Sequence, residues 1–281
     1  MILSVIIPAF KEPLLAKTVK SLLDTSELGS NLEVLVVLDG PQTNTDIPDD
    51  PRVSFVRLKR TLGMRNAINE GLEYATGEYV MKVDAHCLFD QGFDKKMVDE
   101  MKPNWILIPR RYSLDETNWT RDMNRPARDY HYLEFPKDSK YGKGLVIMDW
   151  FGKKGTEIDD TMIFQGSCWL AQREYFMKHV GLLDDNPETY GSFAGEQHEI
   201  GLKYWLGDGA IKVNKKTWYA HLSKRTRHYK SGEYEQDFKS PPNTAKQHTY
   251  CANYWMAQPG FKDYINRFNP PGWDIYQYEQ N

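Results

Sequence analysis

Cysteine is scarce in this chain, and its placement excludes two common uses. The three cysteines, Cys87, Cys168 and Cys251, lie far apart in the sequence. An odd number of widely separated cysteines argues against a disulfide framework and favours a reducing compartment. The spacing also provides no close cysteine pair that could begin a zinc site.

The chain also lacks a strong excess of charge of either sign. It has 36 Lys and Arg residues against 39 Asp and Glu, which gives a formal net charge of −3 and a pI near 6.2. Such a balance provides no overall attraction to nucleic acid or to an anionic membrane. A partner of that kind would therefore need a local basic patch.

Long hydrophobic runs, internal repeats and low-complexity tracts are absent as well. No stretch reaches the roughly 18 apolar residues that suggest a membrane span. The N-terminal segment MILSVIIPAF is apolar, but it has no basic leader and contains a proline. We therefore expect a first β-strand there rather than a signal peptide, no membrane span and a cytoplasmic protein.

What is present is an ordinary globular composition, 40% hydrophobic and 27% charged, with a regular pattern in its first part. Runs rich in β-branched residues predict strands, and apolar residues at spacings of three and four predict helices. Their alternation predicts an α/β fold with a mostly parallel sheet flanked by helices. The expected strands are residues 3–7, 32–38, 53–58, 79–83 and 105–109, and the expected helices lie around 15–24, 64–75 and 93–101.

The later part of the sequence is less regular. Residues 110–161 are polar, interrupted by proline and glycine, and too long for a simple connection, which is typical of a functional segment or a packed insertion. The chain ends in a tail rich in tyrosine and tryptophan. Between these regions the sequence predicts strands at 162–171, 210–213 and 217–222, a short helix around 174–179, and a helix from the motif GEQHE at 195–199 to Trp205.

Two polar residues at the end of one expected strand indicate a metal site. Asp84 and His86 follow the apolar residues 79–83 and, two positions apart in an extended chain, share a face. A carboxylate and an imidazole placed this way are metal ligands at the rim of a parallel sheet, where α/β folds bind their ligands. A simple turn or cap is the alternative interpretation. Asp39 ends another expected strand at the same edge.

Several segments, in order, resemble the GT-A glycosyltransferases of the family 2 type. They are VIIPAF, VLDG, the helix with Arg65 and Asn66, ATGEYVMKVDAHC, GSCWLA, GEQHEIGLKYW and AHL, and they cover roughly residues 3–222. In detail they are similar to the polypeptide N-acetylgalactosaminyltransferases, whose usual Asp-X-Asp motif is Asp-X-His. The resemblance implies a Rossmann-like GT-A fold with an acceptor-side insertion and an aromatic-rich C-terminal extension. Its parts would be a nucleotide-sugar-binding half at 1–109, an acceptor-binding and catalytic half at 110–222, and an extension at 223–281 that forms a lid or an acceptor groove.

The resemblance further implies a metal-dependent enzyme that transfers a sugar from a UDP-sugar to a hydroxyl acceptor. The leaving diphosphate develops negative charge, which a divalent cation stabilises as a Lewis acid. Asp84 and His86 match the motif that holds this ion beside the donor, and His221 aligns with a later histidine that completes the ligands. These ligand types suit Mn²⁺, with Mg²⁺ as the alternative. The alternative for His221 is a strand-end histidine packed beside Tyr219.

Five residues are expected to contact the nucleotide sugar besides Asp84. Asp39 matches the aspartate that accepts a hydrogen bond from the uracil N3–H, although a turn before Gly40 would also explain it. Arg65 resembles an arginine that pairs with phosphate, with a solvated helix charge as the alternative. The remaining three are Phe10 and Glu12, which follow the first strand, and Trp169, for which sugar stacking competes with core packing.

The motif GEQHE differs from the Gly-Glu-Asp of inverting relatives, because Gln197 cannot act as a general base. It resembles the Gly-Glu-Asn-X-Glu of retaining N-acetylgalactosaminyltransferases, in which the leaving phosphate can accept the proton. The resemblance therefore favours retention, with inversion as the alternative. Glu196 and Glu199 are expected to position the donor sugar or the acceptor, and His198 to act as a base if its ring faces the cleft. The alternative for Glu199 is a carboxylate in the first turn of a helix that the helix dipole stabilises.

A basic and aromatic segment follows His221. It is expected to close over the diphosphate or to bind an anionic acceptor, and a solvated charge run is the alternative. The acceptor stays open among a surface glycan, a protein Ser or Thr, and a hydroxymethylated DNA base. A non-catalytic nucleotide-sugar-binding module is the remaining hypothesis. The residues of the segment are Lys224, Arg225, Arg227, His228, Tyr229 and Lys230, then Tyr234 and Phe238.

Overall fold

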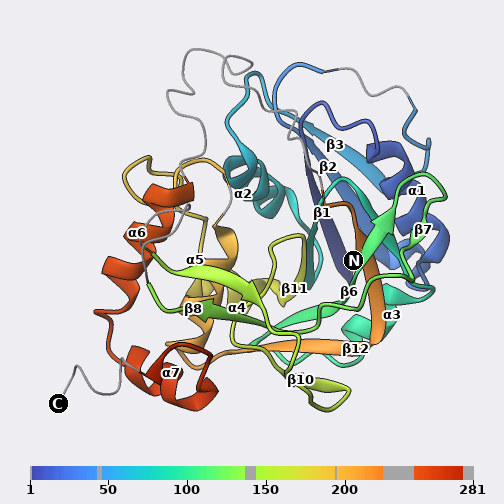
Figure 1. Cartoon of the computed structure of the whole chain (residues 1–281). Coiled ribbons are helices and arrows are strands. Elements are labelled where there is room, and N and C mark those ends of the chain that lie inside the picture. The colour runs from blue at the N-terminus through green and yellow to red at the C-terminus, as the bar shows by residue number, and fades with distance from the viewer. Residues whose placement is uncertain (1, 43–45, 137–143, 194, 224–243, 275–281) are drawn as a thin grey trace.

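The chain folds around a central β-sheet that carries helices on both faces, as the computed structural model in Figure 1 shows. The structure describes residues 2–42, 46–136, 144–193, 195–223 and 244–274. In this part of the chain the sheet has ten strands. In spatial order its main path is β10 (Ile158–Asp160), β12 (Ala210–His221), β6 (Trp105–Asp115), β11 (Cys168–Gln172), β4 (Tyr79–Val83), β1 (Leu3–Ala9), β2 (Leu32–Leu38) and β3 (Val53–Arg57); β5 (Cys87–Phe89) pairs with β12, and β7 (Thr120–Arg121) pairs with β6.

The half of the sheet that the N-terminal residues build is parallel. β1 pairs in parallel with β2 and β4, and β2 pairs in parallel with β3. Nearly all residues of β1 and β2 are buried, as expected for strands that helices cover on both sides. Parallel strands end at the same edge of a sheet. The residues that follow β1, β2 and β4, which are Phe10, Asp39 and Asp84, therefore meet at one edge.

The other half of the sheet is mixed. β11 runs antiparallel between β4 and β6, whereas β12 runs parallel to β6. The sequence predicts two strands at 210–213 and 217–222, but the structure has the single strand β12, whose register against β6 shifts between Asn214 and Trp218. The shift interrupts the alternation of apolar residues and so mimics a strand end. After the shift, β12 continues to His221.

Two strands differ in length from the sequence prediction. β6 continues past Pro109 to Asp115, because it pairs with β12 again after the register shift. β11 begins at Cys168 rather than at residue 162. The apolar residues 162–164 are buried, but they belong to an irregular segment of the core rather than to the strand.

The segment 110–161 contains short strands that the sequence does not reveal. β8 (His131–Glu134) and β9 (Val146–Asp149) form a separate antiparallel pair, and β7 and β10 extend the main sheet. Strands this short provide little periodicity, and their partners lie elsewhere in the chain. The expectation of a packed insertion agrees with these elements.

Helices cover both faces of the sheet, because each presents an apolar stripe to it. α1 and α3 pack in one cluster with Val5, Val34 and Met81, whereas α2, α4 and α5 pack in another with Ile6 and Val80. The helix bounds are α1 (Leu15–Thr25), the 3-10 helix η1 (Gly29–Asn31), α2 (Met64–Tyr74), α3 (Phe93–Val98), α4 (Arg173–His179), α5 (Glu196–Trp205), α6 (Thr244–Trp255) and α7 (Phe261–Phe268).

The C-terminal tail, for which the sequence analysis predicts no element, forms α6 and α7. They lie on the side of α5 and β8, away from α1 (Figure 1). In α7 the buried residues Phe261, Tyr264, Ile265 and Phe268 recur at helical spacing and join a third apolar cluster. The indole of Trp273 joins the same cluster and donates a hydrogen bond to β8. Within residues 244–274, the extension is therefore packed on the second half of the chain.

In the described ranges, no helix has both the length and the apolar composition needed to cross a membrane. The 12 residues of α6, for example, fall short of the roughly 20 that a bilayer requires.

Candidate functional site

A cavity of about 390 Å³ opens where β1, β2 and β4 end, and we call it the strand-end cavity. Many of the residues predicted from the sequence line it, namely Phe10, Glu12, Asp39, Asp84, His86, Glu196 and His221. Gln197 lines it as well, together with Lys82, Arg111 and Arg128, to which the sequence analysis assigns no role. The edge of the parallel sheet thus brings together residues from distant parts of the chain.

Asp84, His86 and His221 come together in this cavity as an Asp–His–His triad. Asp84 follows β4, and His221 is the last residue of β12. Each offers one ligand atom, and these atoms lie within 4.8 Å of one another. Nε2 of His221 lies 3.0 Å from Oδ2 of Asp84, and Nε2 of His86 lies 4.0 Å from the same oxygen. This spacing suits three ligands of one metal ion.

Two members of the triad, Asp84 and His221, have charge states that suit metal binding. Burial lowers the pKa of His221 to about 3, so its imidazole is neutral at pH 7. Burial alone would raise the pKa of Asp84, but the charge of Lys82 and the hydrogen bond from His221 hold it well below its usual range. A metal ion binds carboxylates in their ionised form and imidazoles in their neutral form, and Asp84 and His221 have these charges at pH 7. The triad therefore fits a divalent cation such as Mn²⁺ or Mg²⁺.

Lys82 connects the triad to α5. Its buried ammonium group lies 2.5 Å from Oδ1 of Asp84 and 3.1 Å from Oε1 of Glu196, and donates to the carbonyl of Gly166 at 2.6 Å. Burial opposes the charge of Lys82, but the two carboxylates raise its pKa above the ordinary value. A Cβ on Gly166 would lie 2.1 Å from Oε1 of Glu196, so a larger residue there would displace this carboxylate from its place beside Lys82. Glu196 is thereby fixed at the cavity wall.

Glu12 supports a metal ligand in this structure. Its Oε2 lies 3.1 Å from Nδ1 of His86, which orients the ring with Nε2 toward Asp84. Its Oε1 accepts a hydrogen bond from the amide of Leu14 at 3.2 Å, so the carboxylate is held near the start of α1. The resemblance places Glu12 with Phe10 in the base pocket. Both line the strand-end cavity, and Glu12 contacts the triad through His86.

Asp39 is held rigidly in the same cavity. Its Oδ1 accepts from the amide of Leu62 at 2.7 Å, and its Oδ2 accepts from the amide of Gly63 at 2.9 Å. Burial raises the pKa of Asp39 to about 6, against the effect of these two hydrogen bonds. The group is therefore mostly ionised at pH 7. Each oxygen keeps accepting capacity for a ligand donor such as the N3–H of uracil.

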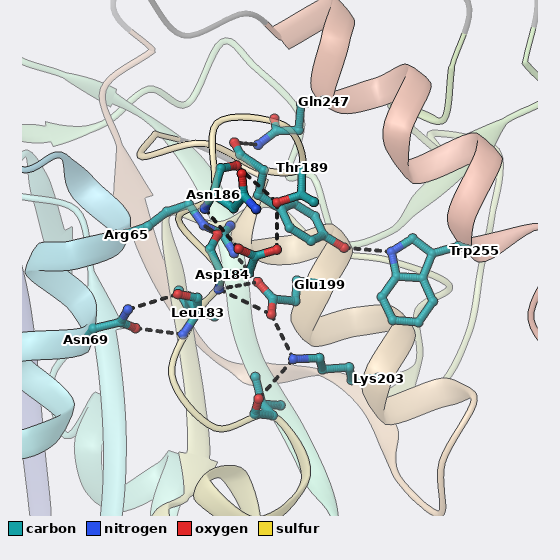
Figure 2. Close-up of polar contacts among 12 residues, drawn as sticks. Arg65, Asn69, Leu183, Asp184, Asn186, Thr189, Glu199, Lys203, Gln247 and Trp255 are labelled. Atoms are coloured by element: carbon teal, nitrogen blue, oxygen red, sulfur yellow. Dashed lines mark hydrogen bonds and ion pairs between the residues drawn. The ribbon is translucent and has the colours of Figure 1, made fainter. Parts of the chain in front are cut away.

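Arg65 and Glu199 form a buried ion pair that does not line the strand-end cavity (Figure 2). Nε of Arg65 donates to the carbonyl of Asp184 at 2.7 Å, and its guanidinium lies 4.6 Å from the ring centroid of Tyr190. Glu199 also accepts from Lys203 at 2.7 Å. The expected phosphate contact of Arg65 and sugar contact of Glu199 do not match this geometry, because each charge is already paired inside the protein.

His198 and Trp169 face the interior. Nε2 of His198 lies 3.0 Å from the carbonyl oxygen of Leu145, and burial lowers the pKa of His198 to about 3. Its ring does not line the cavity, so the condition for a role as base is not met. Trp169 is fully buried and stacks on Phe176 with ring centroids 5.2 Å apart. Trp169 therefore packs in the core, which is the alternative to stacking on a sugar.

Three charged residues of the cavity were not predicted from the sequence, namely Lys82, Arg111 and Arg128. The signal for Lys82 was present, since it is a lysine inside the apolar strand 79–83. Arg111 gave no comparable signal, because it follows Pro109 in a segment without a regular pattern. It is 5% exposed and lies on the continuation of β6.

The basic and aromatic segment beyond His221 cannot be placed in the site. Lys224, Arg225, Arg227, His228, Tyr229, Lys230, Tyr234 and Phe238 all lie outside the described residues. Its role as a lid or acceptor groove stays a prediction.

Comparison with protein families gives one match over most of the chain. A sequence model described as "Glycosyl transferase family 2" matches residues 4–180. The matched range begins in β1 and includes Asp39, Asp84 and His86. It ends before α5 and His221.

Named relatives share about a quarter of their aligned residues with this chain. Identity is 24% over 287 residues to "Putative polypeptide N-acetylgalactosaminyltransferase 13" of Drosophila melanogaster, covering 91% of this chain and 47% of that protein. It is 27% over 230 residues to "Polypeptide N-acetylgalactosaminyltransferase 9" of Homo sapiens, covering 74% of this chain and 35% of that protein. The chain therefore spans about a third to a half of the length of these relatives.

Solved structures confirm the predicted fold class. GalNAc-T7 crystallised with UDP, GalNAc and Mn²⁺ superposes with a TM-score of 0.65 and 15% identity, covering 99% of this chain and 57% of that one. S. aureus TarS 1-349 in complex with UDP-GlcNAc gives a TM-score of 0.52 at 15% identity, covering 81% and 60%. The architecture is thus the α/β GT-A arrangement, a largely parallel sheet between helices.

Proposed function

Because the chain belongs to glycosyl transferase family 2, we propose that it transfers a sugar from a UDP-sugar to a hydroxyl group with the help of Mn²⁺ or Mg²⁺. The observation that carries this proposal is the placement of Asp39 and the Asp–His–His triad in one cavity. The uracil of a UDP-sugar needs a hydrogen-bond acceptor for its N3–H, and its diphosphate needs a cation. In this cavity Asp39 offers the hydrogen-bond acceptor, and the triad offers the ligands for the cation. The ligands named with the similar structures, UDP with Mn²⁺ and UDP-GlcNAc, support the choice of donor.

The metal ion would be held by Asp84, His86 and His221. When bound, it supplies Lewis-acid stabilisation of the charge that develops on UDP as the bond to the sugar breaks. The surrounding residues prepare the ligands, since Glu12 orients the His86 ring and Lys82 keeps Asp84 ionised.

The uracil end of the donor is assigned to Asp39. Its carboxylate accepts the N3–H of uracil, and the amides of Leu62 and Gly63 fix its orientation before the ligand arrives. Rigid support of this kind reduces the entropy cost of binding. Phe10 lines the same cavity and offers a ring face to the base.

The proposed reaction proceeds with retention at the anomeric carbon. The acceptor oxygen forms its bond to that carbon, the bond from the carbon to the UDP oxygen breaks, and the acceptor proton passes to the leaving phosphate. Gln197 supports this route, because it lines the cavity where inverting relatives have a basic aspartate and has no proton affinity of its own. Glu196, which Lys82 holds at the wall, is assigned to positioning sugar hydroxyls.

The first acceptor to test is a protein Ser or Thr hydroxyl, because the named relatives are polypeptide N-acetylgalactosaminyltransferases. A surface glycan and a hydroxymethylated DNA base are the other acceptors in the same hydroxyl class.

The experiment is incubation with a panel of UDP-sugars and Mn²⁺, with UDP release as the readout. We expect release from at least one donor, enhancement by an acceptor peptide, and loss of release after chelation of the metal. NMR of the product's anomeric proton then distinguishes retention from inversion. A chain that neither binds nor releases UDP with any donor contradicts the proposal. Binding without turnover favours the non-catalytic module instead.

A further inference from the structure

Arg111 is a buried charge in the strand-end cavity that the proposed function leaves without a ligand. It pairs with Tyr219 across the β6–β12 register, and its carbonyl accepts from the amide of Arg128 at 2.8 Å. These main-chain contacts fix the residue at the cavity wall beside the triad. Arg111 as a whole residue is 5% exposed, and it lines the cavity.

Among the residues that the structure describes, the direct side-chain contacts of Arg111 include no carboxylate, and its charge acts on a carboxylate only at longer range, through Asp149. One terminal nitrogen lies 3.1 Å from Nδ1 of His221, and Nε is buried without a hydrogen-bond partner. No ion pair joins Arg111 to a carboxylate within the described ranges. The neighbouring arginines differ, because Arg110 forms two contacts of 2.9 and 2.7 Å with Asp129, and Arg128 lies 3.5 Å from Asp149. A buried guanidinium in this state calls for an anionic ligand.

The contact with His221 conflicts with metal coordination at Nε2. Arginine has only donors, so Nδ1 of His221 must be unprotonated in this contact, and the ring proton is then on Nε2, facing Asp84. An ion at Nε2 requires the neutral ring to carry its proton on Nδ1. That N–H would face the donors of Arg111. Arg111 therefore has to leave His221 when the triad is filled.

We propose that Arg111 binds the diphosphate of the nucleotide-sugar donor, and that it occupies His221 while donor and metal ion are absent. This inference rests on the proposed function. The diphosphate is the anion that lies beside an ion held by the triad, and the guanidinium fork matches phosphate oxygens in a bidentate geometry. Arg111 thus supplies a second positive charge for the leaving group and makes the triad bind its ion more weakly until the donor is present.

Two titrations with Arg111→Met test this, because the proposal predicts changes of opposite sign. Calorimetry with Mn²⁺ alone should show tighter binding than in the wild type, since the competitor for His221 is gone. Calorimetry with UDP at saturating Mn²⁺ should show binding weaker by about tenfold to a hundredfold, as for the loss of a hydrogen bond to a charged group. Arg110→Met removes the same charge one residue away, outside the cavity lining, and should change neither affinity.

A second variant keeps the test decisive if Arg111→Met does not fold by circular dichroism. Arg111→Lys keeps the charge but not the fork, so its UDP affinity should fall between those of the wild type and a charge-free variant. UDP affinity equal to the wild type in the folded Arg111 variant, with unchanged Mn²⁺ affinity, overturns this inference alone. A wild-type protein that binds no UDP with Mn²⁺ overturns both this inference and the proposed function.

Discussion

The first turn of α5 carries two buried glutamates, Glu196 and Glu199, in different surroundings. Glu196 pairs with Lys82 from β4 and lines the strand-end cavity. Glu199 pairs with Arg65 from α2 and with Lys203, and does not line the cavity. Both residues are about 2% exposed. What separates them is the partner that the tertiary structure brings, not their local sequence.

The comparison extends to the two charge clusters around these glutamates. In the cluster of Arg65, Glu199 and Lys203, ion pairs and a backbone carbonyl take up the charges (Figure 2). In the cluster of Lys82, Asp84 and Glu196, charged oxygens and the triad histidines still face a cavity. The Arg65 cluster is therefore expected to determine the stability of the fold, and the Lys82 cluster is expected to determine ligand binding.

The largest expected effect is on stability, from Glu199→Gln. Removing one partner of a buried ion pair leaves the other charge uncompensated, which costs about 3–5 kcal/mol. The free energy of unfolding in urea should fall by this amount, because Arg65 is fully buried. UDP affinity of the folded fraction should stay near that of the wild type, since the cavity lining does not include Glu199.

A matched double variant separates the pair from the packing around it. Arg65→Met combined with Glu199→Leu removes both charges, and the result should be more stable than Glu199→Gln alone. Lys203→Met should have a smaller effect, because the Lys203 side chain is 30% exposed. If Glu199→Gln instead unfolds like the wild type and loses turnover, the assignment of this cluster to stability is wrong.

The next effect is on turnover, from Asp84→Asn. The change removes a charged ligand from the triad with little change in side-chain volume, and lowers its capacity to hold a metal ion. We expect metal-dependent UDP release to fall by about 10²–10³-fold, as when one group that stabilises a developing charge is removed. Lys82 keeps its contacts with Glu196 and Gly166, so the thermal melting midpoint should fall less than in Glu199→Gln.

Asp24→Asn is the control for this change, because Asp24 pairs with the exposed Lys20 on α1 and does not line the strand-end cavity. It should leave both turnover and its dependence on Mn²⁺ unchanged. Full activity of Asp84→Asn without a higher metal requirement would show that the triad is not the metal site.

The parallel half of the fold could be predicted from the sequence, because each strand has its own apolar run and each helix its own stripe. The mixed half could not. Whether β12 is one strand or two depends on a register shift against β6, and the length of β6 depends on the same pairing. Such contacts join residues about a hundred positions apart and leave no local pattern. The stripe of α7 was readable, since Phe261, Tyr264, Ile265 and Phe268 have helical spacing.

In the site, too, some features could be predicted from the sequence and others could not. Parallel strands end at one edge, so the meeting of Asp39, Asp84 and Phe10 follows from the strand pattern alone. The sequence could not show that Arg65 turns to Glu199 instead of the cavity, because a helix surface does not reveal what will cover it. The position of Arg111 in the cavity depends on the same register shift that brings β12 back beside β6.

The smallest expected effect concerns the pH dependence of base binding by Asp39, whose pKa burial raises to about 6. The folded state then binds more protons than the unfolded state between about pH 4 and 6, so this group destabilises the fold as pH rises through that window.

Base binding by Asp39 has the opposite pH dependence, because only the carboxylate accepts the uracil N3–H fully. Affinity for uridine, which has no phosphate and needs no metal ion, should fall by about tenfold from pH 7.5 to 5. Asp39→Asn keeps an accepting oxygen at every pH and should show weaker but pH-independent binding. Equal pH dependence in both proteins would mean that Asp39 does not contact the base, whatever the triad beside it binds.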